Sequence, residues 1–566
     1  MSFLLSLLVS SSAIFAASVH SRPSSVLAHS FYSQLGEIYP EHASDAGLYR
    51  FDGKATDYAS QPETRYAEFL KRWSAQVETL AARHAGDREM WIDLDLMRRT
   101  IELGEAQLTF AQKEIRFYPA SEIIYGSLFT LVNPQTSATR KRKAGARFRA
   151  MMEQRTLSHW LKEMRDSVAA ATPEKLWPHR EQVADYLENS RLMADEVATL
   201  LREGRVYDEA LFQEFTAQVA AVDDFIRENI LPRARATNLP RAHYEHELRR
   251  YGITISPDEL KRRALEDYRI LMPELRKLAE RIGAELGLPK SERTPFHVSA
   301  ALRAQGITGT DELMRFTHDI VAEIEAIIRR EDLMTLAQVP PQIRIGTAAE
   351  NVITPFQHVN VPPALAPNAA DVPEYVFPVT AEGLPMDEDC SYRAAAMTLT
   401  AHEVFGHGLQ FCHLSTSGTR VRATMGTNST VLEGWAMYIE DLMMPYHEPR
   451  ERYGAVQSIL FRVGRAFLEP MVQAGEIDER AVLDTFVNDI GLAESFARGE
   501  YQRYTWRSPG QAPSYYFGLK SLRDMKARAK AVKGKDFTER WFNDHILLSG
   551  PMPFDLCEKA LLGQDA

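Results

Sequence analysis

Residues 400–408, Thr-Ala-His-Glu-Val-Phe-Gly-His-Gly, contain the residue types of a catalytic zinc site. In the familiar zinc motif, two histidines stand four positions apart on one helix face, beside a glutamate that serves as general base. Here His402 and His407 stand five positions apart, and Glu403 directly follows the first histidine. We predict that both imidazoles bind one Zn²⁺ ion and that Glu403 is the general base.

The spacing of the two histidines makes a structural demand. On a regular α-helix, residues five positions apart are rotated by about 140° from each other, so their side chains cannot reach one ion. One extra residue accommodated as a π-type bulge would bring them back into line. Gly406 lies inside the interval, where backbone distortion is cheapest. We therefore predict a π-bulge or local break between Val404 and Gly408. A regular helix would leave two unrelated surface histidines.

A catalytic zinc site needs a third protein ligand and one open position. The segment Thr-Val-Leu-Glu-Gly-Trp-Ala-Met-Tyr-Ile-Glu supplies Glu433, which lies 31 residues after His402 across a loop long enough to reverse the chain. Glu440 lies seven residues further on and shares a helix face with Glu433. We predict Glu433 as the ligand and Glu440 as a carboxylate that orients a histidine from behind.

Two alternatives for these residues stay open. Thr430 and Glu433 also have the spacing of a helix capping box, in which Glu433 would bind backbone rather than metal. His413 is a rival ligand, but six positions after His407 it points away.

The surrounding sequence predicts a mainly α-helical fold with a small β-sheet near the site. Residues 27–335 are almost continuously helical in pattern, with Ser256 and Pro257 typical of a helix start. Between Pro340 and Pro385 the helical pattern stops, and the short runs Gln-Ile-Arg-Ile-Gly and Glu-Tyr-Val-Phe-Pro-Val resemble strands. Helix returns near Ser391, runs to about Cys412, and begins again near Thr430 after a polar loop.

Composition limits the function classes. The chain has 566 residues and a formal net charge of −11, which disfavours nucleic acid as a partner. No flexible linker divides it, so we predict one large domain over residues 27–566 in two lobes, 27–335 and 336–566. The three cysteines are too few for a disulfide framework.

The N-terminus indicates export. Residues 3–17 are mostly apolar, and Ala16 and Ser18 have the spacing of a signal-peptidase site. We predict a signal peptide over residues 1–18 and a periplasmic or secreted protein. No Lys or Arg precedes the apolar core, so a retained N-terminal helix in a cytoplasmic protein is the alternative. No cysteine lies near for a lipid anchor, and no stretch is apolar enough to insert stably into a membrane.

Several motifs resemble the bacterial domain of unknown function 885 family. They are the His-Glu-x-x-Gly-His string followed by Leu409-Gln410, the Glu433-Gly434-Trp435-Ala436 string with Tyr438 and Glu440, Pro509-Gly510-Gln511 followed by Ser514-Tyr515 and Gly518, and residues 38–53 and 255–268. The resemblance covers nearly all of the chain after residue 28.

That family is similar to zinc peptidases of the thermostable-carboxypeptidase and angiotensin-converting-enzyme type. The resemblance implies a helical fold with two lobes around a deep cleft, and an exported or lipid-anchored hydrolase. The family usually reads His-Glu-x-x-Pro-Gly-His-His, whereas this chain is one residue shorter and has Gly408 in place of the last histidine. The shorter spacing also resembles dipeptidyl-peptidase III, whose acidic second motif this chain matches poorly.

We therefore predict a zinc-dependent peptide hydrolase, of the carboxypeptidase or dipeptidyl type. A hydrogen-bond donor should stabilise the tetrahedral oxyanion, and Tyr515 is our candidate, with Tyr516 as the alternative and aromatic packing as the non-catalytic interpretation. The Glu-Tyr-Val-Phe-Pro-Val strand could align a peptide by edge pairing. The alternative hypotheses are a zinc esterase or amidase, and a binding protein with a structural zinc. No Gly-x-Ser-x-Gly string is present for a serine esterase. The oligomeric state cannot be inferred.

Overall fold

The computed structural model describes residues 23–132, 136–347, 350–351, 354, 356–365, 372–380, 383, 385–386, 388–414 and 419–563. The segment 1–18, for which we predict a signal peptide, lies outside them. The described residues are mainly helical, with one small three-stranded sheet, which confirms the fold class at that level. No helix among them is both long and apolar enough to cross a bilayer.

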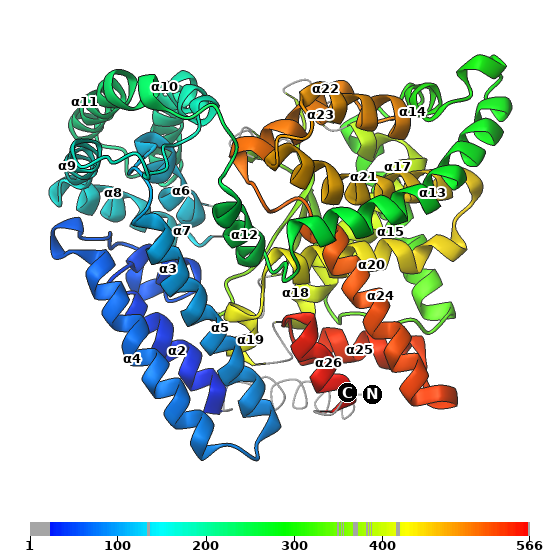
Figure 1. Ribbon diagram of the computed structural model, residues 1–566, viewed down its shortest axis with the longest axis horizontal. Helices are drawn as coiled ribbons and strands as arrows, with labels where there is room; N and C mark the ends of the chain where they lie inside the picture. The colour runs from blue at the N-terminus through cyan, green and yellow to red at the C-terminus, as the bar shows by residue number, and fades with distance from the viewer. Residues whose placement is uncertain are drawn as a thin grey trace. The chain divides into compact units, whose positions relative to one another are not determined.

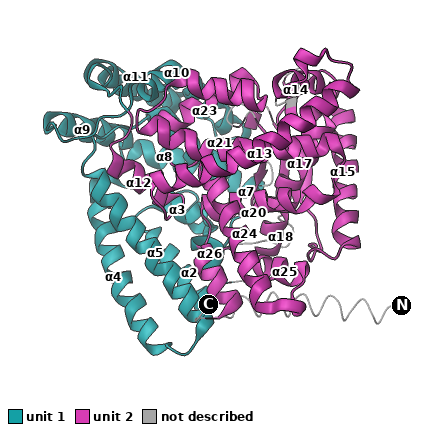
Figure 2. Ribbon diagram, turned by 45° about the vertical axis from the view of Figure 1, so that its right-hand side comes forward, with its two compact units in different colours: residues 1–237, 363–371, 419–425 teal, residues 238–362, 372–418, 426–566 magenta. Residues whose placement is uncertain are grey.

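The chain divides into two compact units, shown in two colours in Figure 2. The first comprises residues 1–237, 363–371 and 419–425, and the second residues 238–362, 372–418 and 426–566. The sequence pattern placed the border of the lobes at residue 335, where helical periodicity stops. The border between units lies 98 residues earlier because helices after residue 238 pack on C-terminal helices, as α13 does on α21.

Unit 1 is all-helical among its described residues. Its α-helices are α2 (Pro23–Leu35), α3 (Pro40–Asp45), α4 (Pro62–Arg83), α5 (Arg88–Ala111), α6 (Ala120–Val132), α7 (Ala138–Lys141), α8 (Lys143–Glu153), α9 (Thr156–Ala169), α10 (Arg180–Glu203), α11 (Glu209–Phe225) and α19 (Arg420–Met425), with short turns η1 (Tyr49–Phe51), η2 (Tyr58–Ser60), η3 (Ile226–Ile230) and η4 (Leu231–Arg233). The long helices α4 and α5 lie side by side (Figure 1). A core that includes Trp160, Tyr186 and Phe215 holds α6 and α8–α11 together.

Unit 2 carries every residue predicted to do chemistry. Its helices are α12 (Arg241–Arg250), α13 (Pro257–Glu285), η5 (Lys290–Glu292), α14 (Pro295–Arg303), α15 (Thr310–Arg330), η6 (Glu388–Ser391), α17 (Arg393–Thr400), η7 (Ala401–Gly408), α18 (Leu409–Leu414), α20 (Ser429–Met443), η8 (Met444–Tyr446), α21 (Pro449–Gln473), α22 (Glu479–Leu483), η9 (Asp484–Ile490), α23 (Glu494–Gln502), η10 (Arg503–Arg507), α24 (Ser514–Lys533), η11 (Gly534–Asp536), α25 (Glu539–Ser549) and α26 (Phe554–Leu562). The predicted start of α13 is correct, since Ser256 accepts a hydrogen bond from the Glu259 backbone and Pro257 follows it.

Helix-on-helix packing in unit 2 positions the site. The longest helices, α13 and α21, pack along each other (Figure 1), and α17 packs on α21. Helix α20 lies between η7 and α24. The polar loop predicted between the two motif helices is shorter than expected, because it contains α19, which belongs to unit 1.

The sheet corrects one prediction. Its strands are β1 (Gln342–Ile345), β2 (His358–Asn360) and β3 (Glu374–Phe377), in the order β1-β3-β2, with β1 parallel and β2 antiparallel to β3. Two of the three were predicted, and β2 was not. The proposal that the Glu-Tyr-Val-Phe-Pro-Val run offers a free edge to a peptide is wrong, since β3 pairs on both sides and all four of its residues are buried. Strands β2 and β3 both contact η7.

Candidate metal centre

The predicted helix distortion is present. The helix that begins at Arg393 is α-helical to Thr400, π-helical from Ala401 to Gly408, and α-helical again from Leu409. The wider π turn places positions five apart on one face, because each backbone N–H then bonds to the carbonyl five residues before it. The rings of His402 and His407 consequently lie 4.8 Å apart between centroids.

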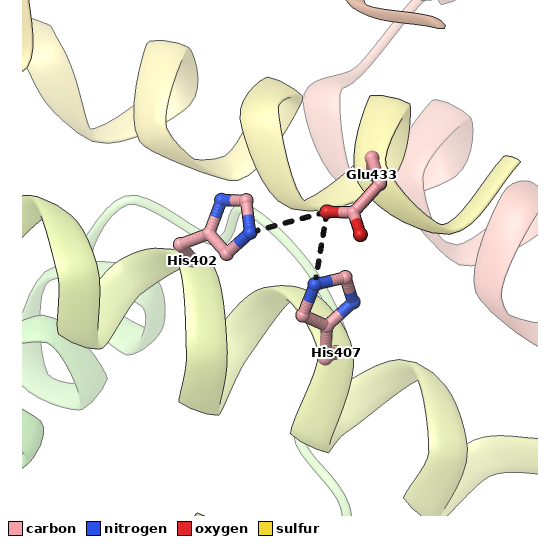
Figure 3. A group of neighbouring side chains, drawn as sticks. All are labelled: His402, His407 and Glu433. Atoms are coloured by element: carbon pink, nitrogen blue, oxygen red, sulfur yellow. Dashed lines mark ion pairs between the residues drawn. The ribbon is translucent and has the colours of Figure 1, made fainter. Parts of the chain in front are cut away.

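Glu433 meets the two histidines from the facing helix α20. Its Oε2 atom lies 3.4 Å from His402 Nε2 and 3.3 Å from His407 Nε2, as Figure 3 shows. One ligand atom from each residue falls within a group whose members are all within 4.8 Å of one another. Tetrahedral ligands at about 2.1 Å from an ion are separated by roughly 3.4 Å. The spacing therefore suits one small metal ion bound by two imidazoles and a carboxylate.

The polar atoms also fit an ion. Glu433 Oε2 is buried and has no hydrogen-bond partner of suitable geometry among the described residues. Burial by itself would lower the pKa of His402, but in the metal-free site contacts with the Glu433 and Glu440 carboxylates raise it to about 10, so an ion would have to displace a proton from this imidazole. Burial likewise opposes ionisation of Glu433, yet the neighbouring His407 and His402 hold its pKa well below the ordinary value. Glu433 is thus an anion, as a metal ligand must be.

Glu440 orients His402 from behind, as predicted. Its Oε1 atom lies 2.7 Å from His402 Nδ1, which leaves Nε2 directed at Glu433. Its other oxygen accepts a hydrogen bond of 2.6 Å from Ser458, and Ser458 in turn accepts one of 2.6 Å from Arg462. This chain of contacts fixes the imidazole orientation that a metal ligand needs.

The capping alternative for Glu433 is wrong. Helix α20 is capped by Asn428, whose side chain accepts a hydrogen bond from the Val431 backbone, so Glu433 lies one turn inside the helix. Close backbone contacts bring Glu433 to the histidines. A Cβ atom on Gly406 would lie 2.7 Å from Ala436 Cα, and one on Gly434 would lie 2.5 Å from Gly518 Cα. Only glycine allows these approaches of η7 to α20 and of α20 to α24.

Glu403 directly follows His402 but is not one of the three grouped residues. Burial raises the pKa of its carboxyl group, while the charges of His402 and His407 oppose that rise. A carboxylate of raised pKa beside a metal site is suited to accept and return a proton near neutral pH.

Tyr515 and Tyr516 have different surroundings. The Tyr515 ring stacks near His402, with 6.3 Å between ring centroids and 14° between ring planes. The Tyr516 hydroxyl instead donates a hydrogen bond of 2.8 Å to Asp267. Tyr515, the predicted oxyanion donor, is therefore the one of these two tyrosines whose ring lies beside His402.

His413 is not part of the group. Its Nε2 atom lies 2.9 Å from the Thr335 carbonyl oxygen. Sequence reasoning missed three residues near the group: Ser458 and Arg462 behind Glu440, and His358 on β2, the strand that packs against η7. These residues lie on elements far from the two motifs in the sequence. The one sequence signal is the four-residue spacing of Ser458 and Arg462, which places both on one face of a helix.

A family model described as "Bacterial protein of unknown function (DUF885)" matches residues 40–561. The chain belongs to the DUF885 family. The predicted family membership is thus confirmed, and the motifs that suggested it include both segments of the candidate metal centre. No curated protein matches the chain.

Solved structures share the DUF885 fold of this chain. A "putative lipoprotein of unknown function" from Shewanella oneidensis aligns with a TM-score of 0.74 at 17% identity, over 96% of this chain and 100% of its own. A "putative lipoprotein" from Colwellia psychrerythraea aligns with a TM-score of 0.67 at 16% identity, over 95% of this chain and 98% of its own. At these identities the likeness establishes the fold alone.

Proposed function

We propose that this DUF885 protein is a zinc-dependent peptide hydrolase of the exopeptidase type. One observation carries the proposal: a π-turn brings His402 and His407 onto Glu433 Oε2, with Glu403 adjacent. Two imidazoles and one carboxylate form the ligand set of catalytic zinc sites, which keep a fourth position open. Structural zinc sites are closed and usually contain cysteine, and no cysteine is in this group.

The residues divide the chemistry among them. His402, His407 and Glu433 would hold the ion, which when bound supplies a Lewis acid and a water of lowered pKa. A Glu403 carboxylate oxygen would take the proton of the attacking water and pass it to the leaving amine. The Tyr515 hydroxyl would donate a hydrogen bond to the oxyanion that develops on the substrate carbonyl. Glu440 would keep His402 in the tautomer that binds through Nε2.

The proposal includes the architecture and location that the family resemblance implies. The architecture is the two-lobed fold of the carboxypeptidase and angiotensin-converting-enzyme type, with a deep cleft. The location is outside the cytoplasm, supported by the apolar residues 3–17 and by the names of the two structural relatives. Cell fractionation with N-terminal sequencing of the mature protein tests the location, and an intact Met1 on cytoplasmic protein contradicts it.

A digest of a peptide library tests the activity. Peptides with free and blocked termini are incubated with the protein, with and without chelator, and the products are read by mass spectrometry. We expect cleavage near a free terminus that stops on chelation and returns with zinc. Cleavage of esters or non-peptide amides but of no peptide would favour the second candidate, a zinc esterase or amidase. Zinc binding without any hydrolysis would favour a structural ion.

A further inference from the structure

Two arginines lie over the Tyr515 ring, next to the candidate metal centre, and a third, Arg503, shares the Glu500 carboxylate with one of them. Arg462 and Arg465 lie on α21, with guanidinium carbons 5.7 Å and 4.7 Å from the centre of the Tyr515 ring. Arg503 begins η10. Burial and the charge of Glu433 raise the pKa of Tyr515, and the charges of Arg465, Arg503 and Arg462 each oppose that rise. We refer to Arg462, Arg465 and Arg503 as the arginine group.

The arginine group has fewer carboxylates than cations. Glu500 accepts two hydrogen bonds of 2.7 Å from Arg465, and the same carboxylate lies 3.8 Å from Arg503. Glu440 lies 3.9 Å from Arg462 but is already engaged by His402 and Ser458. Among the described residues, these two carboxylates are the ones within 4 Å of the three guanidinium groups, so the direct ion-pair partners are fewer than the cations. A largely buried cation without a counter-charge is costly, so the group favours an anion.

Glu469 does not supply the missing charge. It is a further buried carboxyl group whose pKa is affected by Arg503, but burial raises that pKa to about 8, so at neutral pH the group is mostly uncharged. Its Oε1 atom accepts a hydrogen bond from the Gly510 backbone rather than from an arginine.

The arginine group also retains donor capacity. The Nε–H of Arg462 is buried and has no acceptor among the described residues. Arg503 donates from Nη1 to Gln511 at 3.1 Å, and 27% of its side chain is exposed. A guanidinium group presents several N–H donors in a plane, which matches the two oxygens of a carboxylate.

We propose that the arginine group binds the terminal carboxylate of the substrate, so that the fragment released at the metal centre ends in a free α-carboxyl group. The inference rests on the proposed function and specifies its substrate class: cleavage occurs near the carboxyl end of a peptide. Tyr515 connects the two sites, since its ring contacts both the arginine group and His402.

Binding without turnover tests the inference. Calorimetry on the Glu403→Gln protein, supplied with zinc, measures the affinities of short peptides as free acids and as C-terminal carboxamides. We expect the free acid to bind about 10- to 100-fold more tightly, the range of a charge-assisted contact. Arg503→Gln should remove this preference by weakening only the free acid. Arg507→Gln, which removes an exposed charge from the same element η10, should leave the preference unchanged.

The outcomes separate this inference from the proposed function. Equal affinities of acid and amide overturn the inference, even if zinc-dependent hydrolysis is found. An Arg503→Gln protein that loses both affinities equally, or an amidated peptide ending in glutamate that binds as tightly as the free acid, also overturns it. Absence of zinc-dependent hydrolysis would contradict the proposed function, and the acid-to-amide ratio would still be measured because it needs no catalysis.

Discussion

At the residue scale, the proposed chemistry depends most on Glu403. It neighbours the ligands without belonging to the grouped set, and burial raises its pKa. Glu403→Gln keeps the size and polarity of the side chain but cannot accept a proton at neutral pH. We expect kcat to fall by about 10²- to 10⁴-fold, with zinc content unchanged. Parallel kinetics and metal analysis check this, and turnover equal to wild type would remove Glu403 from the mechanism.

The phenol of Tyr515 gives a second prediction at this scale. Tyr515→Phe should lower kcat by about 10- to 1000-fold with little change in KM, because an oxyanion contact is made mainly in the transition state. Tyr516→Phe is the matched control, since the Tyr516 hydroxyl is engaged by Asp267. A loss confined to Tyr516→Phe would mean that the wrong ring has been chosen.

The grouping of His402, His407 and Glu433 could be predicted from sequence because the residue types and spacings are local. The five-residue interval between His402 and His407 demanded a π-turn, and the π-turn is present. The capping alternative for Glu433 failed because Asn428, a preferred N-cap residue two positions before Thr430, takes the cap. The hydrogen bonds from Arg462 to Ser458 and from Ser458 to Glu440 could not be predicted from the sequence, because they depend on how α21 packs.

At the element scale, the site depends on how closely three helices approach one another. Gly406→Ala would place a Cβ atom 2.7 Å from Ala436 Cα, which separates η7 from α20. We expect a loss of about 1–3 kcal/mol in the free energy of unfolding, together with weaker zinc binding. Gly499→Ala in α23 is the control, because no atom lies within 4 Å of its added Cβ. That control should be neutral or slightly stabilising.

Thermal melts and zinc titrations of both alanine variants make the comparison. If Gly406→Ala melts and binds zinc like Gly499→Ala, then the close approach of η7 to α20 does not position the proposed ligands.

The three strands show the limit of predicting elements from local sequence. The runs that form β1 and β3 are recognisable, but β2 is not, and neither is the central position of β3 in the sheet. Strand order is set by pairing between distant segments, so it cannot be inferred from the residues of a single strand.

At the scale of the whole molecule, helical content followed from periodicity, but the units did not follow from composition. The change in sequence pattern near Pro340 marks the end of the mainly helical region, whereas the first border between the two compact units lies between Thr237 and Asn238. Unit 1 also takes in residues 419–425, from the loop between the two ligand-bearing segments. The sequence pattern cannot show that these residues belong to unit 1, because this depends on where the loop packs rather than on which residues it contains.

The stability of the folded chain should depend on the protonation of Glu469. Burial raises its pKa from 4.5 to about 8, so the folded state binds this proton more tightly than the unfolded state does. The resulting stabilisation is full below about pH 4.5 and is lost as the pH rises towards 8. Glu469→Gln stays neutral throughout. Relative to wild type, it should gain roughly 2–4 kcal/mol between pH 5 and pH 8, as urea unfolding would show. A difference that is constant with pH would contradict this.

The most direct test of the metal centre is the zinc content of purified protein. His402, His407 and Glu433 are the residues whose ligand atoms converge. Mass-spectrometric metal analysis after chelation, reloading and desalting compares wild type with the His402→Ala, His407→Ala double variant, and circular dichroism verifies that both are folded. The account predicts one zinc ion per wild-type chain and almost none in the double variant. A double variant that retains zinc at full stoichiometry, or a folded wild type that takes up none, would contradict it.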